Sequence, residues 1–114
     1  MVASGRGDQE VGSEVFMKVV VEALAYADTD EIAEFYEQQE AGAGIYFVRQ
    51  LKALIRELEW TGGIHNKRKE FHIRRVRRFP ISLYYKIIGE EIRVIAVTHA
   101  HRDPSWINKI LRKR

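Results

Sequence analysis

The hydrophobic period of the chain changes near residue 62, and this change constrains the fold more than any other feature. Before it, apolar residues recur at helical spacing along one stripe: Ile45, Val48, Leu51, Ile55 and Leu58. Thr61-Gly62-Gly63 then predicts the end of that helix. Over 81–88 the period becomes two, which is typical of a strand. Helices followed by strands predict the α+β class, with the helix stripes packed on one face of a sheet.

The first half of the sequence predicts a strand followed by two helices. An apolar segment, Val15–Leu24, contains three adjacent valines and favours a strand. Asp28 with Glu31 fits a capping box, which predicts a first helix over 29–40. The small residues at 41–44 predict a tight break before the second helix. Helices joined by so short a link are expected to form an antiparallel hairpin.

Three strands are predicted in the second half: Glu70–Val76, Ile81–Ile88 and Ile92–His99. Gly89-Glu90 suits a two-residue turn, so the strands should follow one another as an antiparallel meander. Asp103–Arg114 carries apolar residues at helical spacing and predicts a short helix or a docked tail. With the helix hairpin on one face of the sheet, we expect the other face to stay open. The Arg and His residues of the strands would line that open face.

A chain of 114 residues is long enough for one domain with a modest core. Residues 1–16 are Gly-rich and show no usable period, so we expect a disordered extension before a domain spanning 17–114. Cys is absent, which excludes disulfides and Cys-ligated zinc. The sequence has neither an apolar run of about 18 residues nor a secretory signal. These features predict a cytoplasmic protein that does not span a membrane and needs no cofactor.

Charge is distributed unevenly along the chain. Residues 1–64 hold 5 Lys+Arg and 12 Asp+Glu, a balance of −7, whereas residues 65–114 hold 14 Lys+Arg and 4 Asp+Glu, a balance of +10. Such asymmetry within one domain predicts a cationic surface that attracts an anionic macromolecule. Basic residues that protect strand edges from aggregation are the alternative explanation.

Three segments resemble toxins of the RelE/ParE superfamily. Residues 30–36 (DEIAEFY) are similar to the first helix of these toxins, and 78–85 (RFPISLYY) to their strand beginning R-F-P. Residues 92–106 (IRVIAVTHAHRDPSW) are similar to their ending around H-x-x-R-D-P. The resemblance spans about 17–108 and implies a helix hairpin on a twisted, mainly antiparallel sheet. It also implies a type II toxin–antitoxin system, in which a cognate antitoxin forms a complex with the toxin and neutralises it.

The resemblance leaves two mechanisms open. The R-F-P and H-x-x-R-D-P features resemble the ParE-like branch more closely, which implies growth inhibition by binding a macromolecular target such as DNA gyrase. The alternative is a RelE-like endoribonuclease that cuts mRNA on the ribosome. A third possibility is a module of the same shape that binds nucleic acid without being toxic.

RNA cleavage would need a general base, a general acid and a cation on the scissile phosphate. The candidates for these roles are His72, Arg78, His99, His101 and Arg102. The C-terminal catalytic Tyr that the resemblance implies has no counterpart after Tyr85, which counts against a nuclease. His99 could instead hydrogen-bond the following turn, Asp103 could form an Asx-turn, and Arg102 could pair with a carboxylate. His99 and His101 lack a third metal ligand, so no metal site is expected.

Binding roles are assigned separately. The expected target-binding residues are Arg74, Arg75, Arg77, Arg78 and Arg102. Alternation along a strand places Arg74 and Arg75 on opposite faces, so these guanidinium groups cannot all share one surface. An antitoxin groove is expected where apolar side chains remain at the edge of the helix hairpin: Phe47, Leu54 and Trp60.

Overall fold

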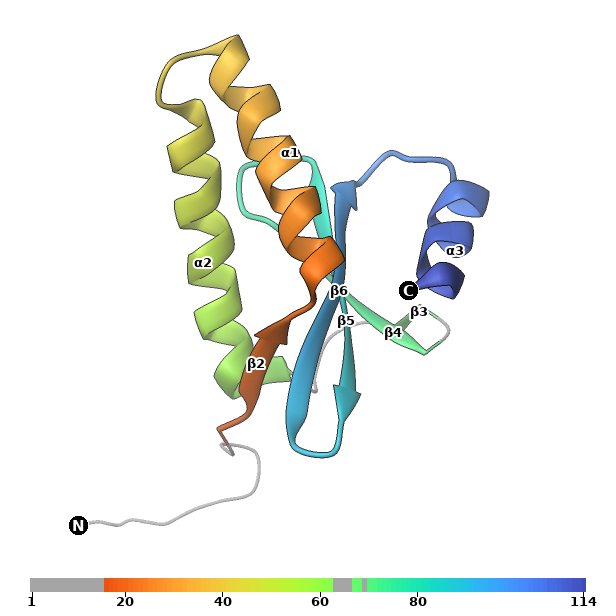
Figure 1. The fold of residues 1–114 in the computed structure, drawn as a ribbon. Helices are drawn as coiled ribbons and strands as arrows, with labels where there is room; N and C mark the ends of the chain where they lie inside the picture. The colour runs from red at the N-terminus through yellow and green to blue at the C-terminus, as the bar shows by residue number, and fades with distance from the viewer. Residues whose placement is uncertain (1–15, 63–66, 69) are drawn as a thin grey trace, which may run out of the picture.

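A computed structural model describes residues 16–62, 67–68 and 70–114. Figure 1 shows a helix hairpin on one side of a sheet and a short terminal helix on the other. The elements are β2 (Lys18–Val21), α1 (Ala23–Gln39), α2 (Ala43–Thr61), β3 (Lys67–Arg68), β4 (Phe71–Arg75), β5 (Ile81–Ile88), β6 (Glu91–His99) and α3 (Pro104–Lys113). This arrangement confirms the α+β class. The predicted extension lies outside the described residues, except for Phe16.

The five strands form one sheet in the order β2-β6-β5-β4-β3. β2 pairs in parallel with β6, while every other pair is antiparallel, so the predicted meander of β4, β5 and β6 is confirmed. β5 and β6 pair along their full length, from Ile81 opposite His99 to Ile88 opposite Glu91, with an irregularity at Tyr84/Tyr85. The connection between the parallel strands β2 and β6 contains the helix hairpin and the strands β3, β4 and β5.

The first helix begins earlier than its predicted cap. α1 starts at Ala23, directly after the backbone N–H of Glu22 bonds to the carbonyl of Val94 and ends β2. The Ala-rich start of α1 favours helix, and it extends the helix six residues before 29. The capping box proposed for Asp28 is therefore wrong, because Asp28 lies inside the helix. Its carboxylate instead accepts a hydrogen bond from the backbone N–H of Val97 in β6.

The break between the helices is tight, as predicted. Gly42 has φ +91°, a left-handed conformation that glycine adopts without strain. The Glu37 carboxylate accepts hydrogen bonds from the backbone N–H groups of Gly42 and Gly44, at 2.9 and 3.0 Å. A Cβ on Gly44 would lie 2.5 Å from the carbonyl oxygen of Ala33, so only glycine permits this approach of the two helices.

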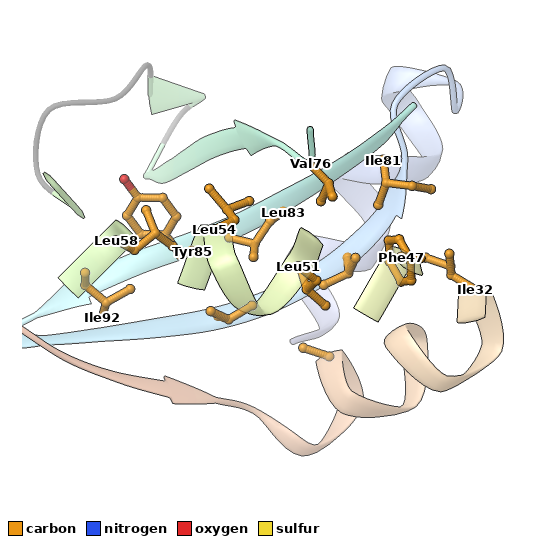
Figure 2. Close-up of a cluster of buried hydrophobic side chains, with 13 residues drawn as sticks. Ile32, Phe47, Leu51, Leu54, Leu58, Val76, Ile81, Leu83, Tyr85 and Ile92 are labelled. Carbon is orange, nitrogen blue, oxygen red and sulfur yellow. The ribbon is translucent and has the colours of Figure 1, made fainter. Parts of the chain in front are cut away.

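The main core lies between the helix hairpin and the sheet (Figure 2). From α2 it receives Phe47, Leu51, Leu54 and Leu58, with Val48 and Ile55 partly buried against them. The prediction that Ile45 belongs to this stripe is wrong, because the buried face of α2 runs through Phe47 and Leu54 and leaves Ile45 59% exposed. From the middle strand it receives Ile81, Leu83 and Tyr85, the face that alternation predicts. The hydroxyl of Tyr85 is buried and donates to the carbonyl of Gly62 at the end of α2.

The opposite face of the sheet is not fully open, contrary to expectation. α3 packs Ile107 and Leu111 against Phe71, Tyr84 and Ala96, forming a second, smaller cluster. The N-cap of α3 is Asp103, whose carboxylate accepts from the backbone N–H of Ser105 at 3.0 Å, as the Asx-turn hypothesis predicts. The terminal segment is thus a docked helix that covers part of the face assigned to strand Arg and His residues.

Candidate target-binding site

Two turns meet at one end of the sheet. The first connects β4 to β5 over 76–80, and the second connects β6 to α3 over 100–103. The backbone N–H of Ala100 donates to the carbonyl of Pro80 at 2.8 Å, which joins the two turns. We call them the paired turns. They bring Arg77 and Arg78 to the same end of the sheet as Arg102.

Aromatic packing fixes the first of the paired turns. The Phe79 ring lies 4.9 Å from Tyr36, 5.5 Å from Tyr46 and 5.3 Å from Phe47, between centroids. Its neighbour Arg78 has φ +70°, which is uncommon for a residue with a side chain. Backbone strain of this kind persists where the surroundings over-determine it, and it clusters at functional sites. Both Arg77 and Arg78 are exposed.

Arg102 lies on an aromatic ring in the second turn. Its guanidinium carbon lies 4.5 Å from the centroid of the Trp106 ring, a cation–π geometry. Of the described residues, no carboxylate forms an ion pair with Arg75, Arg77, Arg78 or Arg102. The pairing of Arg102 with Asp103 or with a helix carboxylate is therefore not found. The guanidinium remains exposed on the protein surface.

A groove of about 380 Å³ lies beside the second turn, between α1 and α3. Phe35 and Trp106 line it with His99 and Arg102, and Glu31 contributes a carboxylate. The ring of His99 contacts that of Phe35 edge-on, with centroids 5.9 Å apart. The groove therefore holds two of the residues proposed for catalysis, together with aromatic walls.

Arg74 is separated from the paired turns. It forms a 3.2 Å ion pair with Glu57 on α2, on the hairpin side of the sheet. Arg75, the next residue along β4, is exposed. The alternation of these two residues follows the prediction, and it leaves Arg74 outside the set of arginines gathered at the turns.

Two other arginines are held in structural ion pairs. Arg93 on β6 contacts Glu22 at 2.7 Å and Glu91 at 2.9 Å, and the hydrogen bond that Arg93 donates to the Glu22 carboxylate is the main cause that raises the pKa of Arg93. Arg114 contacts both carboxylate oxygens of Asp28, at 2.6 and 3.1 Å, and also the carbonyl of Ile95. Bidentate pairing of this kind fastens the end of α3 to α1 and β6.

The histidines proposed for catalysis are dispersed. His72 is buried and stacks on Tyr85, with ring centroids 5.0 Å apart, and it lies opposite Tyr85 in the register. His99 lies opposite Ile81, four residues along the same strand. This spacing corresponds to roughly 13 Å at about 3.3 Å per residue. The described residues contain no group of three or more potential metal ligands.

Two of the three residues proposed for the antitoxin groove are in the core. Phe47 is 0% and Leu54 5% exposed, because the stripe of α2 faces the sheet and not the hairpin edge. The expectation that they remain uncovered is wrong. Trp60 is 55% exposed and contacts the ring of Phe16 with centroids 5.2 Å apart. Only Trp60 of this set can contact a partner without unfolding.

Sequence reasoning missed several residues that shape these sites. Trp106 was assigned to a helical face, and its stacking under Arg102 depends on the turn between them. Phe79 lies in the segment 78–85 that resembles the toxins, but its packing against Tyr36, Tyr46 and Phe47 depends on the position of the helix hairpin. The pairing of Asp28 with Arg114 joins residues 86 positions apart, and neither residue carries a local signal of it.

A helix hairpin on one face of a mixed sheet, with a terminal helix on the other, defines the class of RelE/ParE-like toxin folds. A family model described as the ParE toxin of the type II toxin–antitoxin system parDE matches residues 19–104. The chain belongs to this ParE toxin family, which confirms the resemblance found in its sequence.

A solved structure, titled "Chromosomal ParDE TA system from P. aeruginosa", matches with a TM-score of 0.68. Its sequence is 18% identical to that of this chain. The match covers 98% of the chain in that structure and 75% of this chain. At this identity the likeness establishes the fold. No curated protein matches the sequence. Among the described residues, no helix combines the length and apolar character needed to cross a bilayer.

Proposed function

We propose that this toxin inhibits growth in the cytoplasm by binding DNA gyrase through the paired turns, and that a cognate antitoxin neutralises it. The observation that carries the proposal is the arginine display at the turns. Phe79 anchors one turn among three aromatic rings, and Trp106 supports Arg102 on the other. The guanidinium of Arg102, held on the Trp106 ring, loses little side-chain entropy on binding. The guanidinium groups at the turns suit carboxylates and phosphates equally.

Binding is favoured over RNA cleavage by the placement of the histidines. A general acid and a general base must both reach the same scissile phosphate, within about 3 Å of the atoms they serve. His72 is buried and lies about four strand residues from His99, so these two cannot form such a pair. A nuclease would have to rely on His99 or His101 with Arg78 and Arg102, which defines the variants that separate the two mechanisms.

The antitoxin is expected to contact Trp60 rather than the buried residues of α2. Trp60 and Phe16 are both more than half exposed and touch each other at the end of α2. Exposed aromatic pairs of this kind are frequent anchors in protein interfaces. The antitoxin would therefore cover the end of the sheet that lies away from the paired turns.

The discriminating experiment compares two assays on the purified chain. Inhibition of supercoiling by gyrase is expected, with no discrete cuts in primer extension on translated mRNA. Arg78→Asn, which keeps a residue tolerant of positive φ, should weaken inhibition at least about tenfold, because a charge-assisted contact contributes roughly 1.5–3 kcal/mol. His99→Ala should retain inhibition, and Arg112→Ala on α3 is the matched control.

Discrete mRNA cuts that disappear in His99→Ala would replace this proposal with the endoribonuclease. Salt-sensitive nucleic-acid binding without growth arrest would instead support a non-toxic binding module.

A further inference from the structure

The helix hairpin has a second face, which points away from the sheet. There a groove of about 860 Å³ runs between α1 and α2. Its floor is made of small and apolar residues: Ala33, Gly44, Ile45 and Val48. Ile45, in the first turn of α2, is 59% exposed. None of the residues discussed for target binding lies in this groove.

The two walls of the groove carry opposite charges. α1 contributes the carboxylates of Asp30 and Glu34, whereas α2 contributes the cations Arg49 and Lys52. All four side chains are exposed, and within the described part of the chain no ion pair joins any of them to another residue. The remaining wall carboxylate, Glu37, is bonded to the backbone of the interhelical turn.

We propose that this face binds a second copy of the chain, giving a symmetric dimer built on a four-helix bundle. A two-fold axis parallel to the helices places α1 of each copy over α2 of the other, so each acidic wall meets a basic wall. An axis across the helices would place like walls together and is disfavoured by repulsion. Both axes make all neighbouring helices antiparallel, as in up-and-down bundles, so the charges on the walls decide between them.

The geometry of the hairpin identifies the charged pair that would meet. Gly44 lies beside the turn of α1 between Ala33 and Glu37. A Cβ added to Gly44 would lie 2.5 Å from the carbonyl oxygen of Ala33 and 3.1 Å from the Cβ of Glu37. Arg49 lies five residues after Gly44 along α2, and Asp30 lies five residues before the middle of that α1 turn. The two residues are therefore at the same height along the hairpin. Rotation about an axis parallel to the helices leaves the height of each residue along them unchanged. Asp30 of one copy therefore faces Arg49 of the other, and this contact occurs twice in each dimer.

The test is a charge swap, read by sedimentation equilibrium of the full chain at low and moderate salt. The unaltered protein is expected to dimerise. Asp30→Arg and Arg49→Asp should each raise the dissociation constant about tenfold or more, because each variant loses two attractive contacts and gains repulsion at two sites. The double variant Asp30→Arg/Arg49→Asp should restore dimerisation, since opposite charges again face each other.

Lys109→Asp, an equal charge reversal on α3 outside the groove, is the matched control and should dimerise like the unaltered chain. Circular dichroism and thermal unfolding establish that each variant is folded. A protein that remains monomeric at every concentration overturns the proposal, even if another protein's helix occupies the groove. A double variant no more dimeric than the single ones also overturns it, because the contact would then not be the one inferred.

Discussion

The two faces of the sheet bury very different amounts of apolar surface. Among the described residues, the hairpin face contributes to a cluster of 13 buried residues, whereas the α3 face contributes to one of six. Apolar burial contributes roughly 25 cal/mol per Å², so the hairpin side supplies most of the free energy of folding. The smaller side carries the chain terminus, and Arg102 stacks on its Trp106. Stability and recognition are therefore concentrated in different regions, and variants can separate them.

The largest effect is expected for Phe47→Ala on the hairpin side. Removal of a fully buried ring should lower the free energy of unfolding by about 3–5 kcal/mol. The side chain also supports Phe79, so the paired turns should loosen as well. Urea denaturation measures the loss, and Trp60→Ala is the exposed comparison, expected to cost less than about 1 kcal/mol. A similar cost for both would contradict the assignment of Phe47 to the core.

A smaller effect is expected for Asp28→Ala. The Asp28 side chain on α1 connects the hairpin side of the sheet to the α3 side. The substitution leaves the Arg114 guanidinium and the Val97 N–H without their carboxylate. Because both side chains of the pair keep 16% of their surface exposed, the cost should be about 2 kcal/mol, below the 3–5 typical of a fully buried pair. Hydrogen exchange should increase in α3 and at Val97, while α2 keeps its protection. Unchanged exchange in α3 would count against the fastening role of this pair.

Leu111→Ala tests the smaller cluster itself. The side chain is 6% exposed but lies near the end of a terminal helix, so the surroundings can relax and the loss should be about 2 kcal/mol, at the low end for buried leucine. The opening should be local, with α3 exchanging faster than the sheet. If Leu111→Ala instead unfolded in one cooperative step and lowered the free energy of unfolding as much as Phe47→Ala, the two sides would not be separable.

The last effect appears only at alkaline pH. Burial raises the pKa of Tyr85 to about 12, and the nearby charge of Arg74 opposes the rise. The folded state thus holds the phenolic proton more tightly than the unfolded state, whose pKa is about 10. The stabilisation is complete below pH 10 and is lost between about 10 and 12, at up to about 1.4 kcal/mol per pH unit. Tyr85→Phe should lose less free energy of unfolding than the unaltered chain between pH 10 and 12, as measured by urea denaturation. The same loss in both proteins would refute this role of Tyr85.

The contrast between the sides also explains what the sequence could predict. Periodicity is a local signal, so the helical state of α2, the three meander strands and the facing residues of β5 were predicted closely. The buried face of α2 was predicted only in part, because Leu51 and Leu58 are buried but Ile45 is exposed. The start of α1 was wrong because a plausible capping pair, Asp28 and Glu31, masked the helix-forming residues before it. Phe47 and Leu54 were placed at an edge because the width of a stripe does not say how much of it the sheet covers.

The site was harder to predict because it depends on contacts between distant segments. The motif around Arg78 and Phe79 and the one around Arg102 and Trp106 were both recognised. Their meeting through Ala100 and Pro80 follows from the register of β5 and β6, which the sequence does not specify. The expectation of one open basic face was only partly met, since α3 covers part of that face.

The most direct test of the account removes the arginines of the paired turns without disturbing the core. The triple variant Arg77→Ala/Arg78→Asn/Arg102→Ala changes exposed side chains only. Its free energy of unfolding should fall by no more than about 2 kcal/mol, from about 0.5 kcal/mol per surface substitution and about 0.5–1 kcal/mol for the lost contact of Arg102 with Trp106. On induced expression, growth arrest should be lost. Full growth arrest by this folded variant would contradict the claim that the paired turns carry the toxin's action.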